Sequence, residues 1–211
     1  MAITAQQVKE LREMTGAGPK ACKDALVEMD GNVEKAAEKL REKGLAKAVK
    51  TLGKGRVMNE GLVEIYQHFN KRMAVIVEVN CETDFVAKTD SFQQFAKDVA
   101  MHIATMKPLF VKREDVPADL VAKEQEMQLR ITLEEGKPEN IADKIVAGRM
   151  DKWYSEIVLM EQEFIKDDSK TIGNILTSRV AELGESIEIR RFQRFEIGES
   201  LDSAETDETA E

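Results

Sequence analysis

The residues best suited to metal binding or nucleophilic chemistry are two cysteines and two histidines. They are Cys22, His68, Cys81 and His102. Four such ligands could hold Zn²⁺, but their spacing matches no zinc-binding pattern. A Cys–His pair could instead make Cys81 the nucleophile of a hydrolase, although a structural cysteine on a β-strand is the favoured interpretation. The sequence therefore favours a binding protein without a metal or cofactor over an enzyme.

Recognition through an exposed aromatic side chain is a second kind of chemistry that the sequence offers. Phe85 follows the polar run Glu82-Thr83-Asp84, in which Thr83 can cap a short helical turn that starts at Asp84. A phenylalanine just after a polar turn is positioned to project, and an exposed aromatic side chain suits a protein interface, where large aromatic residues dominate the binding energy. Two alternatives stay open: Phe85 could pack on the chain's own helix around Val99, and Asp84 could only stabilise a helix N-terminus.

Charge and hydropathy limit the classes of partner. The chain has 211 residues and a net charge of −9, but six acidic residues lie in the segment 199–211. The rest holds 34 acidic and 31 basic residues, which is unlike a strongly basic nucleic-acid binder. The longest apolar run, Met73–Val77, is far shorter than the ~20 residues of a membrane-spanning helix. Without an apolar signal region, we expect a cytoplasmic protein with neither a nucleic-acid nor a membrane partner.

The spacing of apolar residues predicts an α+β fold that begins with helices. Residues 1–44 contain three segments in which apolar residues recur at helical spacing, and the last of these segments ends at Gly44. Small residues at the expected helix contacts indicate a compact three-helix bundle. Residues 45–60 carry four basic residues and no acidic residue before Glu60. We expect this segment to be a basic, flexible linker with one helical turn at its start.

Residues 61–198 are expected to form a core in which a small antiparallel sheet packs with helices. A β-hairpin covers 61–80, and its second strand is expected at the centre of the sheet because Met73–Val77 is apolar on both faces. A helix follows over 91–106, with His102 expected at its surface or at the edge of the core. Two helices joined around Gly136-Lys137-Pro138 predict a projecting hairpin over 117–157.

The end of the chain completes this organisation. A further helix is predicted over about 169–183, followed by a last strand over 187–197. The alternation of that strand slips at Arg190-Arg191, which suggests a bulge or mixed faces. The acidic segment 199–211 has too few apolar residues to order itself and is expected to be a disordered tail.

Several motifs along the chain resemble those of one known family. They are Val8-Lys9-Glu10-Leu11-Arg12, Thr15-Gly16-Ala17-Gly18, Ala21-Cys22-Lys23-Asp24-Ala25-Leu26, Tyr66-Gln67-His68, Val79-Asn80-Cys81-Glu82-Thr83-Asp84-Phe85-Val86-Ala87-Lys88, Gly136-Lys137-Pro138, Leu183-Gly184-Glu185 and Ile189-Arg190-Arg191-Phe192. The resemblance is to the bacterial translation elongation factor Ts family and covers about residues 2–198. The chain resembles the short form of that family, whose core corresponds to one half of the core of the longer members.

The resemblance implies guanine-nucleotide exchange on the GTPase elongation factor Tu, without covalent chemistry and without a cofactor. It also implies a homodimer that completes the core and binds two partner molecules. The contact with the GTPase is implied for residues of four segments. These are Thr83, Asp84, Phe85 and Val86; His68; Leu183 and Gly184; and Arg12 with Lys23 in the N-terminal helices. In the family, the residue matching Phe85 inserts between two helices of the GTPase and disturbs its Mg²⁺ site.

The N-terminal segment also resembles ubiquitin-associated domains, which have a glycine-containing loop after the first of three helices. A peptide-binding adaptor without exchange activity is therefore the alternative function. An adaptor would bind its peptide with that loop and the third helix. The segment Thr83–Val86 would then have no role in binding. The two hypotheses differ on Phe85, because only the exchange factor requires its side chain.

Overall fold

The structure is a computed structural model that describes residues 3–52, 57–136 and 138–199. The chain divides into two compact units. The first contains the chain up to Gly61 with Asn80–Gln93 and Gly173–Glu188, and the second contains Leu62–Val79, Gln94–Ile172 and the chain from Ile189. The described part combines α-helices with a three-stranded and a two-stranded sheet, which confirms the α+β class. The expected tail, apart from Glu199, lies outside the described residues.

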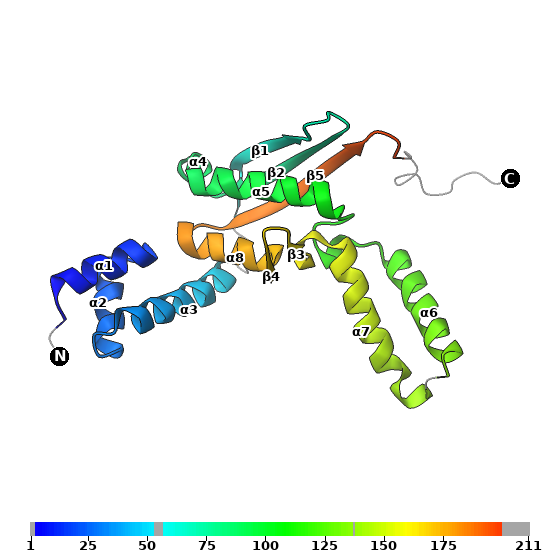
Figure 1. Cartoon of the computed structure of the whole chain (residues 1–211), viewed down its shortest axis with the longest axis horizontal. Coiled ribbons are helices and arrows are strands. Elements are labelled where there is room, and N and C mark those ends of the chain that lie inside the picture. Colours follow the sequence, from blue (N-terminus) through cyan, green and yellow to red (C-terminus); the bar gives the residue numbers. More distant parts are fainter. Residues whose placement is uncertain (1–2, 53–56, 137, 200–211) are drawn as a thin grey trace. The chain divides into compact units, whose positions relative to one another are not determined.

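Three helices begin the first unit, as the sequence predicts (Figure 1). They are α1 (Ala5–Thr15), α2 (Pro19–Glu28) and α3 (Val33–Leu52). Thr4 and Gln7 form a reciprocal capping box at the start of α1, because the N–H of each donates to the side chain of the other. The buried cluster between the helices consists of Leu11, Cys22, Ala25, Leu26 and Ala36. Its small side chains let three short helices approach closely around two leucines.

The expected end of the third helix at Gly44 is wrong, because α3 continues to Leu52. A Cβ atom at Gly44 would lie 3.6 Å from the Cβ of Ala181, so this face of α3 packs on α8 (Ile172–Leu183). Ala48 and Thr51 in the added turns are buried. Packing thus overrides the low helix propensity of glycine. Part of the expected linker is therefore helical, and residues 53–56 lie outside the described residues.

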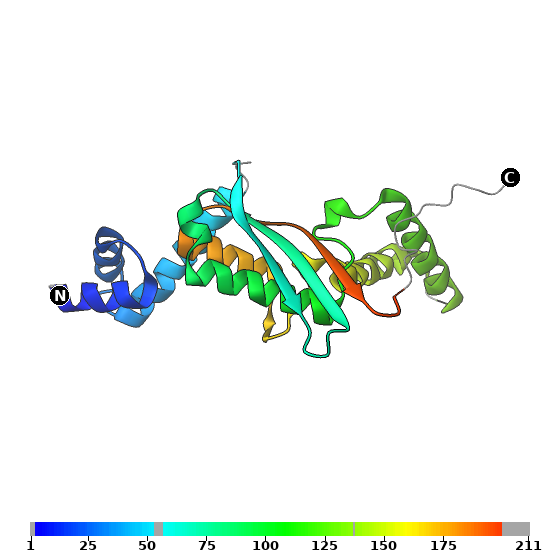
Figure 2. The same ribbon diagram turned by 90° about the horizontal axis from the view of Figure 1, so that it is seen from above.

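An antiparallel sheet with the order β1-β2-β5 forms the centre of the fold. Its strands are β1 (Glu60–Gln67), β2 (Met73–Cys81) and β5 (Ile187–Glu196). The central place of β2 confirms the prediction from its two-sided apolar pattern. Helix α5 (Asp90–Met106) lies along one face of the sheet in Figures 1 and 2, and its Phe95, Val99 and Ile103 are buried. The predicted slip in β5 is present, since Arg190 and Arg191 are both exposed.

The helical hairpin predicted over 117–157 is confirmed as α6 (Ala118–Glu134) and α7 (Glu139–Ile157). Two short 3₁₀ helices, η1 (Arg113–Asp115) and η2 (Leu159–Glu161), lie at its base. Arg113 joins them to α7: its guanidinium donates to Glu161 and to Asp151, the latter at 2.9 Å, and lies 4.3 Å from the centre of the Tyr154 ring. Charge, hydrogen bonds and ring contact together fix the base of the hairpin.

The segment before α8 corrects a second expectation. The helix predicted from about 169 begins only at Ile172, because the preceding residues pair as β3 (Glu163–Phe164) and β4 (Asp167–Thr171). This small sheet is polar apart from the buried Phe164 and has almost no β-branched residues. It therefore lacks the alternation by which a strand is found in a sequence.

The expectation that His102 lies at the helix surface or at the edge of the core is wrong, because the side chain is fully buried. Its Nε2–H donates to Oε1 of buried Gln162 at 3.0 Å, and its Nδ1 accepts the N–H of Ile165 at 3.4 Å. Gln162 in turn donates to the carbonyl of Glu156 at 2.8 Å, at the end of α7. This buried polar group joins α5 to the base of the helical hairpin. Burial lowers the pKa of His102, an effect that the bond to Gln162 partly opposes.

This burial predicts an acid-sensitive fold. Because the folded state disfavours protonated His102, the unfolded state binds more protons below the ordinary histidine pKa of 6.5. The free energy of unfolding should therefore fall as the pH drops through and below that value, by at most about 1.4 kcal/mol per pH unit. Urea unfolding between about pH 7.5 and pH 5.5 measures this slope. The slope should shrink in His102→Gln, and an equal slope in the variant and the wild type would contradict the assignment.

Candidate functional site

The turn after β2 presents Phe85 to solvent. Thr83 is the N-cap of helix α4 (Asp84–Ala87), and its carbonyl accepts the N–H of Ala87 at 3.3 Å. Val86 and Ala87 occupy the inward positions of this single turn and are buried, whereas Phe85 is 80% exposed. The expectation that Phe85 projects is confirmed. Packing of Phe85 within the chain, against the helix around Val99, is wrong, because the single inward face of α4 is taken by its two neighbours.

The carboxylate of Asp84, beside Phe85, is held in place by an ion pair with Lys88. The Lys88 ammonium donates to the Asp84 carboxylate at 2.6 Å, one helical turn away. This hydrogen bond lowers the pKa of Asp84 and raises the pKa of Lys88. The carboxylate also stands at the N-terminus of α4, where the helix dipole favours a negative charge. Asp84 is therefore an exposed carboxylate at neutral pH, next to an exposed aromatic ring.

Thr83 holds this turn in an unexpected way. It occupies the N-cap position that the sequence predicts, but its hydroxyl makes no capping bond to the helix. Instead, the N–H and the hydroxyl of Thr83 donate to the two carboxylate oxygens of Glu185, at 3.1 and 2.8 Å. In the opposite direction, the N–H of Ser186 donates to Glu82 Oε1 at 2.7 Å. The turn and the segment after α8 are thus bound to each other by two carboxylates.

Leu183 and Gly184 form the corner that these bonds bring beside the turn. Helix α8 ends at Leu183, and the N–H of Gly184 donates to the carbonyl of Val180 at 2.9 Å. Gly184 is exposed and has φ +77°, a left-handed conformation that glycine adopts without strain. The helix end is thus a plain glycine-capped terminus. It is also one residue from Glu185, so the predicted site residues 83–86 and 183–184 are brought together.

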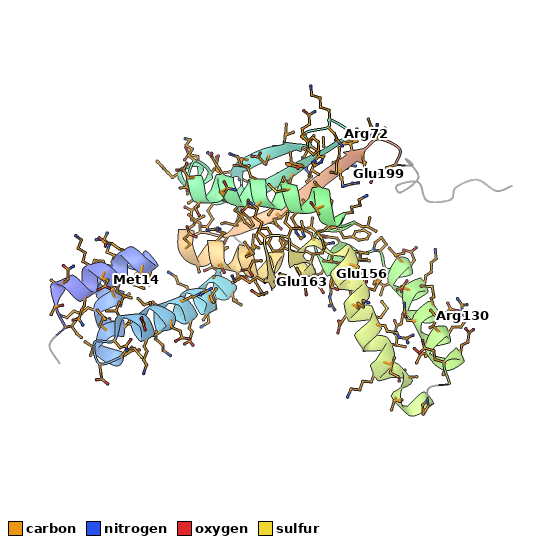
Figure 3. All side chains as sticks on the ribbon, viewed as in Figure 1. Met14, Arg72, Arg130, Glu156, Glu163 and Glu199 are labelled. Atoms are coloured by element: carbon orange, nitrogen blue, oxygen red, sulfur yellow. The ribbon has the colours of Figure 1, made fainter. Side chains whose placement is uncertain are left out.

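The remaining predicted residues lie on other elements. His68 follows β1 in the second unit, where Nδ1 lies 2.9 Å from the Tyr66 hydroxyl and the ring is 4.4 Å from that of the exposed Phe69. Arg12 and Lys23 are exposed on α1 and α2. These helices also expose two large apolar side chains. They are Met14, labelled in Figure 3, and Val27.

Cys81, at the end of β2, is a structural residue. Its thiol is buried and donates to the carbonyl of Thr83 at 3.1 Å. Burial raises the pKa of Cys81 to about 11, and the negative charge of Glu185 adds to the shift. A nucleophilic cysteine needs the opposite shift. The described residues also contain no group of three His, Cys, Asp or Glu side chains arranged to hold a metal ion.

Sequence reasoning did not identify the carboxylates of Glu82 and Glu185 as parts of the site. Both occur within recognised motifs, but their partners lie about a hundred residues away, with separations of 104 and 102 positions. The available signal was their position: Glu82 directly precedes the α4 turn and Glu185 directly follows the end of α8, and backbone N–H groups at such turns need acceptors.

Among the described residues, no helix is long and apolar enough to span a bilayer.

Comparisons with known proteins agree over nearly the whole chain. The family model described as Elongation factor TS matches residues 2–199. Elongation factor Ts of Carboxydothermus hydrogenoformans is 54% identical over 209 residues, which are 99% of this chain and 95% of that protein. The elongation factor Ts of Geobacter sulfurreducens is 51% identical over 211 residues, 100% of this chain and 97% of that protein. The similarity thus includes the N-terminal helices, the sheet, the hairpin and the Phe85 turn.

The raised pKa of Cys81 predicts an inert thiol. With a pKa of about 11, its thiolate at about pH 8 is roughly two orders of magnitude scarcer than that of a free cysteine, and burial restricts access further. Alkylation by iodoacetamide should be at least ~100-fold slower in the folded protein than in urea, as followed by peptide mass spectrometry. Rapid modification of folded Cys81 would revive the hydrolase alternative.

Proposed function

The chain belongs to the elongation factor Ts family, and we propose that it acts in translation elongation as a guanine-nucleotide exchange factor for the GTPase elongation factor Tu. The observation that carries the proposal is the exposure of Phe85, which is 80%, on a turn whose Val86 and Ala87 are buried and whose Thr83 is bound by Glu185. A large aromatic side chain costs free energy in water and contributes most at the centre of an interface. The exposed ring is therefore best explained by a partner.

Exchange on this proposal is a binding reaction in which no covalent bond forms or breaks. The protein binds the GTPase more tightly when GDP and Mg²⁺ are weakly held, so the affinity for GDP falls by the factor by which GDP weakens this protein's own binding. A thousandfold loss of GDP affinity requires about 4 kcal/mol of coupling. The contact surface must therefore supply binding energy that is realised only in the nucleotide-poor state of the GTPase.

In the proposed complex, each of the four segments contacts a different part of the GTPase or supports a neighbouring contact. Phe85 inserts between two helices of the GTPase, with Asp84 as a fixed charge beside it and the Leu183-Gly184 corner against the same area. His68 contacts these helices from the end of β1. Arg12 and Lys23, on the ubiquitin-associated-like N-terminal helices, face the nucleotide-binding domain. We propose that the protein works in the cytoplasm, where translation takes place.

A homodimer is the second element of the proposal. Helix α5 covers one face of the sheet. Because side chains along a strand alternate between the two faces, we assign the exposed apolar side chains of the strands to the other face. They are Val63, Ile65, Ile76 and Phe195, with Ile65 62% exposed. Exposed apolar side chains gathered on one face are typical of protein interfaces. We infer that a second copy packs its sheet on this face, which completes the core that the short form lacks.

The contribution of Phe85 is tested by Phe85→Ala. Because the side chain is exposed, the fold should persist, while loss of the aromatic contact should cost about 1–3 kcal/mol, or roughly 5- to 150-fold in exchange at low protein concentration. The measurement is release of fluorescent GDP from purified elongation factor Tu. Leu109→Ala, which shortens another exposed apolar side chain, is the matched control.

The outcomes separate the two hypotheses. Acceleration that depends on Phe85 supports the exchange factor and its contact together. Acceleration without that dependence removes Phe85 from the site and leaves Arg12, Lys23 and His68. A folded wild-type protein that does not accelerate release would contradict the proposed function and favour the adaptor, whose peptide binding should not depend on Phe85.

The dimer is tested by Ile65→Glu. A charge on the outer face of the sheet should prevent the packing of two apolar faces, so the wild-type dimer should become a monomer of half the mass in sedimentation equilibrium. Circular dichroism should not change, because Ile65 is exposed in the single chain. Thr105→Glu, which adds the same charge at an exposed position of α5, should stay dimeric. A monomeric wild type, or a dimeric Ile65→Glu, would refute this interface.

A further inference from the structure

We propose that Glu185 is a positioning residue, which fixes the turn that carries Phe85 and joins it to the Leu183-Gly184 corner as one contact surface. The inference deepens the proposed function and rests on it, because the surface serves binding of the GTPase. Its basis in the structure is separate: it comes from the hydrogen bonds between two segments that are 102 residues apart in the chain.

Glu185 restrains both the main chain and the side chain of Thr83. One carboxylate oxygen accepts the backbone N–H of Thr83, and the other accepts its hydroxyl, at 3.1 and 2.8 Å. A residue held at its main chain and its side chain by one rigid carboxylate has little rotational freedom left. Because Thr83 also begins α4, its orientation sets the direction of the turn and hence of the Phe85 side chain.

The two segments are bound reciprocally, which fixes their register. Glu82 precedes Thr83, and its carboxylate accepts the N–H of Ser186, the residue after Glu185, at 2.7 Å. Each segment therefore supplies a carboxylate that accepts an N–H of the other segment. A shift of either segment along the other would break both sets of charge-assisted bonds, which are stronger than neutral ones.

A second contact holds the other end of the turn. Glu182, in the last turn of α8, accepts the hydroxyl of Ser91 at 2.7 Å and the guanidinium of Arg179 at 2.6 Å. Ser91 lies at the start of α5, directly after the α4 turn. The turn is thus held at both ends, by Glu182 in the last turn of α8 and by Glu185 just after that helix. Glu185 is the member of this group that reaches the residue from which α4 starts.

Such fixation matters because α4 is only four residues long. A single helical turn gains too few hydrogen bonds to offset the conformational entropy that it loses, so it is not stable alone. A mobile turn would have to be ordered when the partner binds, and that cost would reduce the affinity supplied by Phe85. Because Glu185 already orders the turn in the free protein, this cost is not incurred when the partner binds.

Two substitutions of Glu185 separate geometry from charge. Glu185→Ala removes both bonds to Thr83. In Glu185→Gln, the amide oxygen can accept the Thr83 N–H while the amide nitrogen donates to the Thr83 hydroxyl oxygen, so the geometry persists without the charge. A positioning residue should be rescued by glutamine. A carboxylate that binds the partner directly should not be rescued.

The experiment combines amide hydrogen exchange of the free protein with GDP release from elongation factor Tu. In Glu185→Ala, the amides of residues 83–87 should exchange at least ~10-fold faster, and acceleration of GDP release at low protein concentration should fall about tenfold and recover at saturating concentration. Glu185→Gln should stay within about threefold of wild type in both measurements. Glu163→Ala, which removes the exposed carboxylate labelled in Figure 3, is the matched control and should change neither.

Each contrary result has a distinct meaning. Unchanged amide exchange in a folded Glu185→Ala protein would overturn the proposal, and so would a loss in Glu185→Gln equal to that in Glu185→Ala. If the wild type does not accelerate GDP release, the proposed function fails. The amide exchange of residues 83–87 in Glu185→Ala then still decides whether Glu185 orders the turn: faster exchange supports it and unchanged exchange overturns it.

Discussion

An exposed aromatic side chain contributes most at an interface when its backbone is already ordered, and the bidentate hydrogen bond between Thr83 and Glu185 orders the Phe85 turn in the free protein. Helix α4 is too short to be stable alone, and its two buried residues, Val86 and Ala87, are small. The carboxylate of Glu185 replaces the capping bond that the Thr83 hydroxyl would otherwise make, and it does so from a distant part of the chain. The rest of the first unit can be understood as support for this contact, since Glu182 lies in the last turn of α8, Glu185 follows that helix, and α3 packs on α8.

The sequence predicted the elements that have strong local patterns. The apolar repeats of α1 and α2, the two-sided apolar run of β2 and the glycine–proline signal between α6 and α7 each follow from one segment, and the structure confirms them. In each case the determining interactions lie within a few positions of the residue.

The failures have the opposite origin, because they depend on contacts between distant segments. Gly44 ends a helix by propensity, but its packing on Ala181 continues α3. His102 resembles a surface residue until Gln162, 60 positions away, supplies its buried partner. The bond between Thr83 and Glu185 could not be inferred either, since carboxylates are abundant and no local spacing selects one. The sequence thus indicated candidate residues for the site but not how they are arranged.

The ionisable groups near Phe85 are used to hold geometry rather than to transfer protons. Glu82 and Glu185 accept N–H groups, Asp84 has its pKa lowered by Lys88, and the pKa of Cys81 is raised to about 11. The pKa of Asp84 lies below its ordinary value and that of Cys81 is about 11, so neither group titrates near neutral pH, where an acid–base catalyst would need a titration. A surface of this kind is suited to act by binding alone. For an exchange factor this is sufficient, because the free energy that loosens a nucleotide comes from the contact with the GTPase and is returned when the next nucleotide binds. Under the proposed function, the order of the Phe85 turn sets how much of that contact energy is available for exchange and how much is consumed in ordering the protein itself.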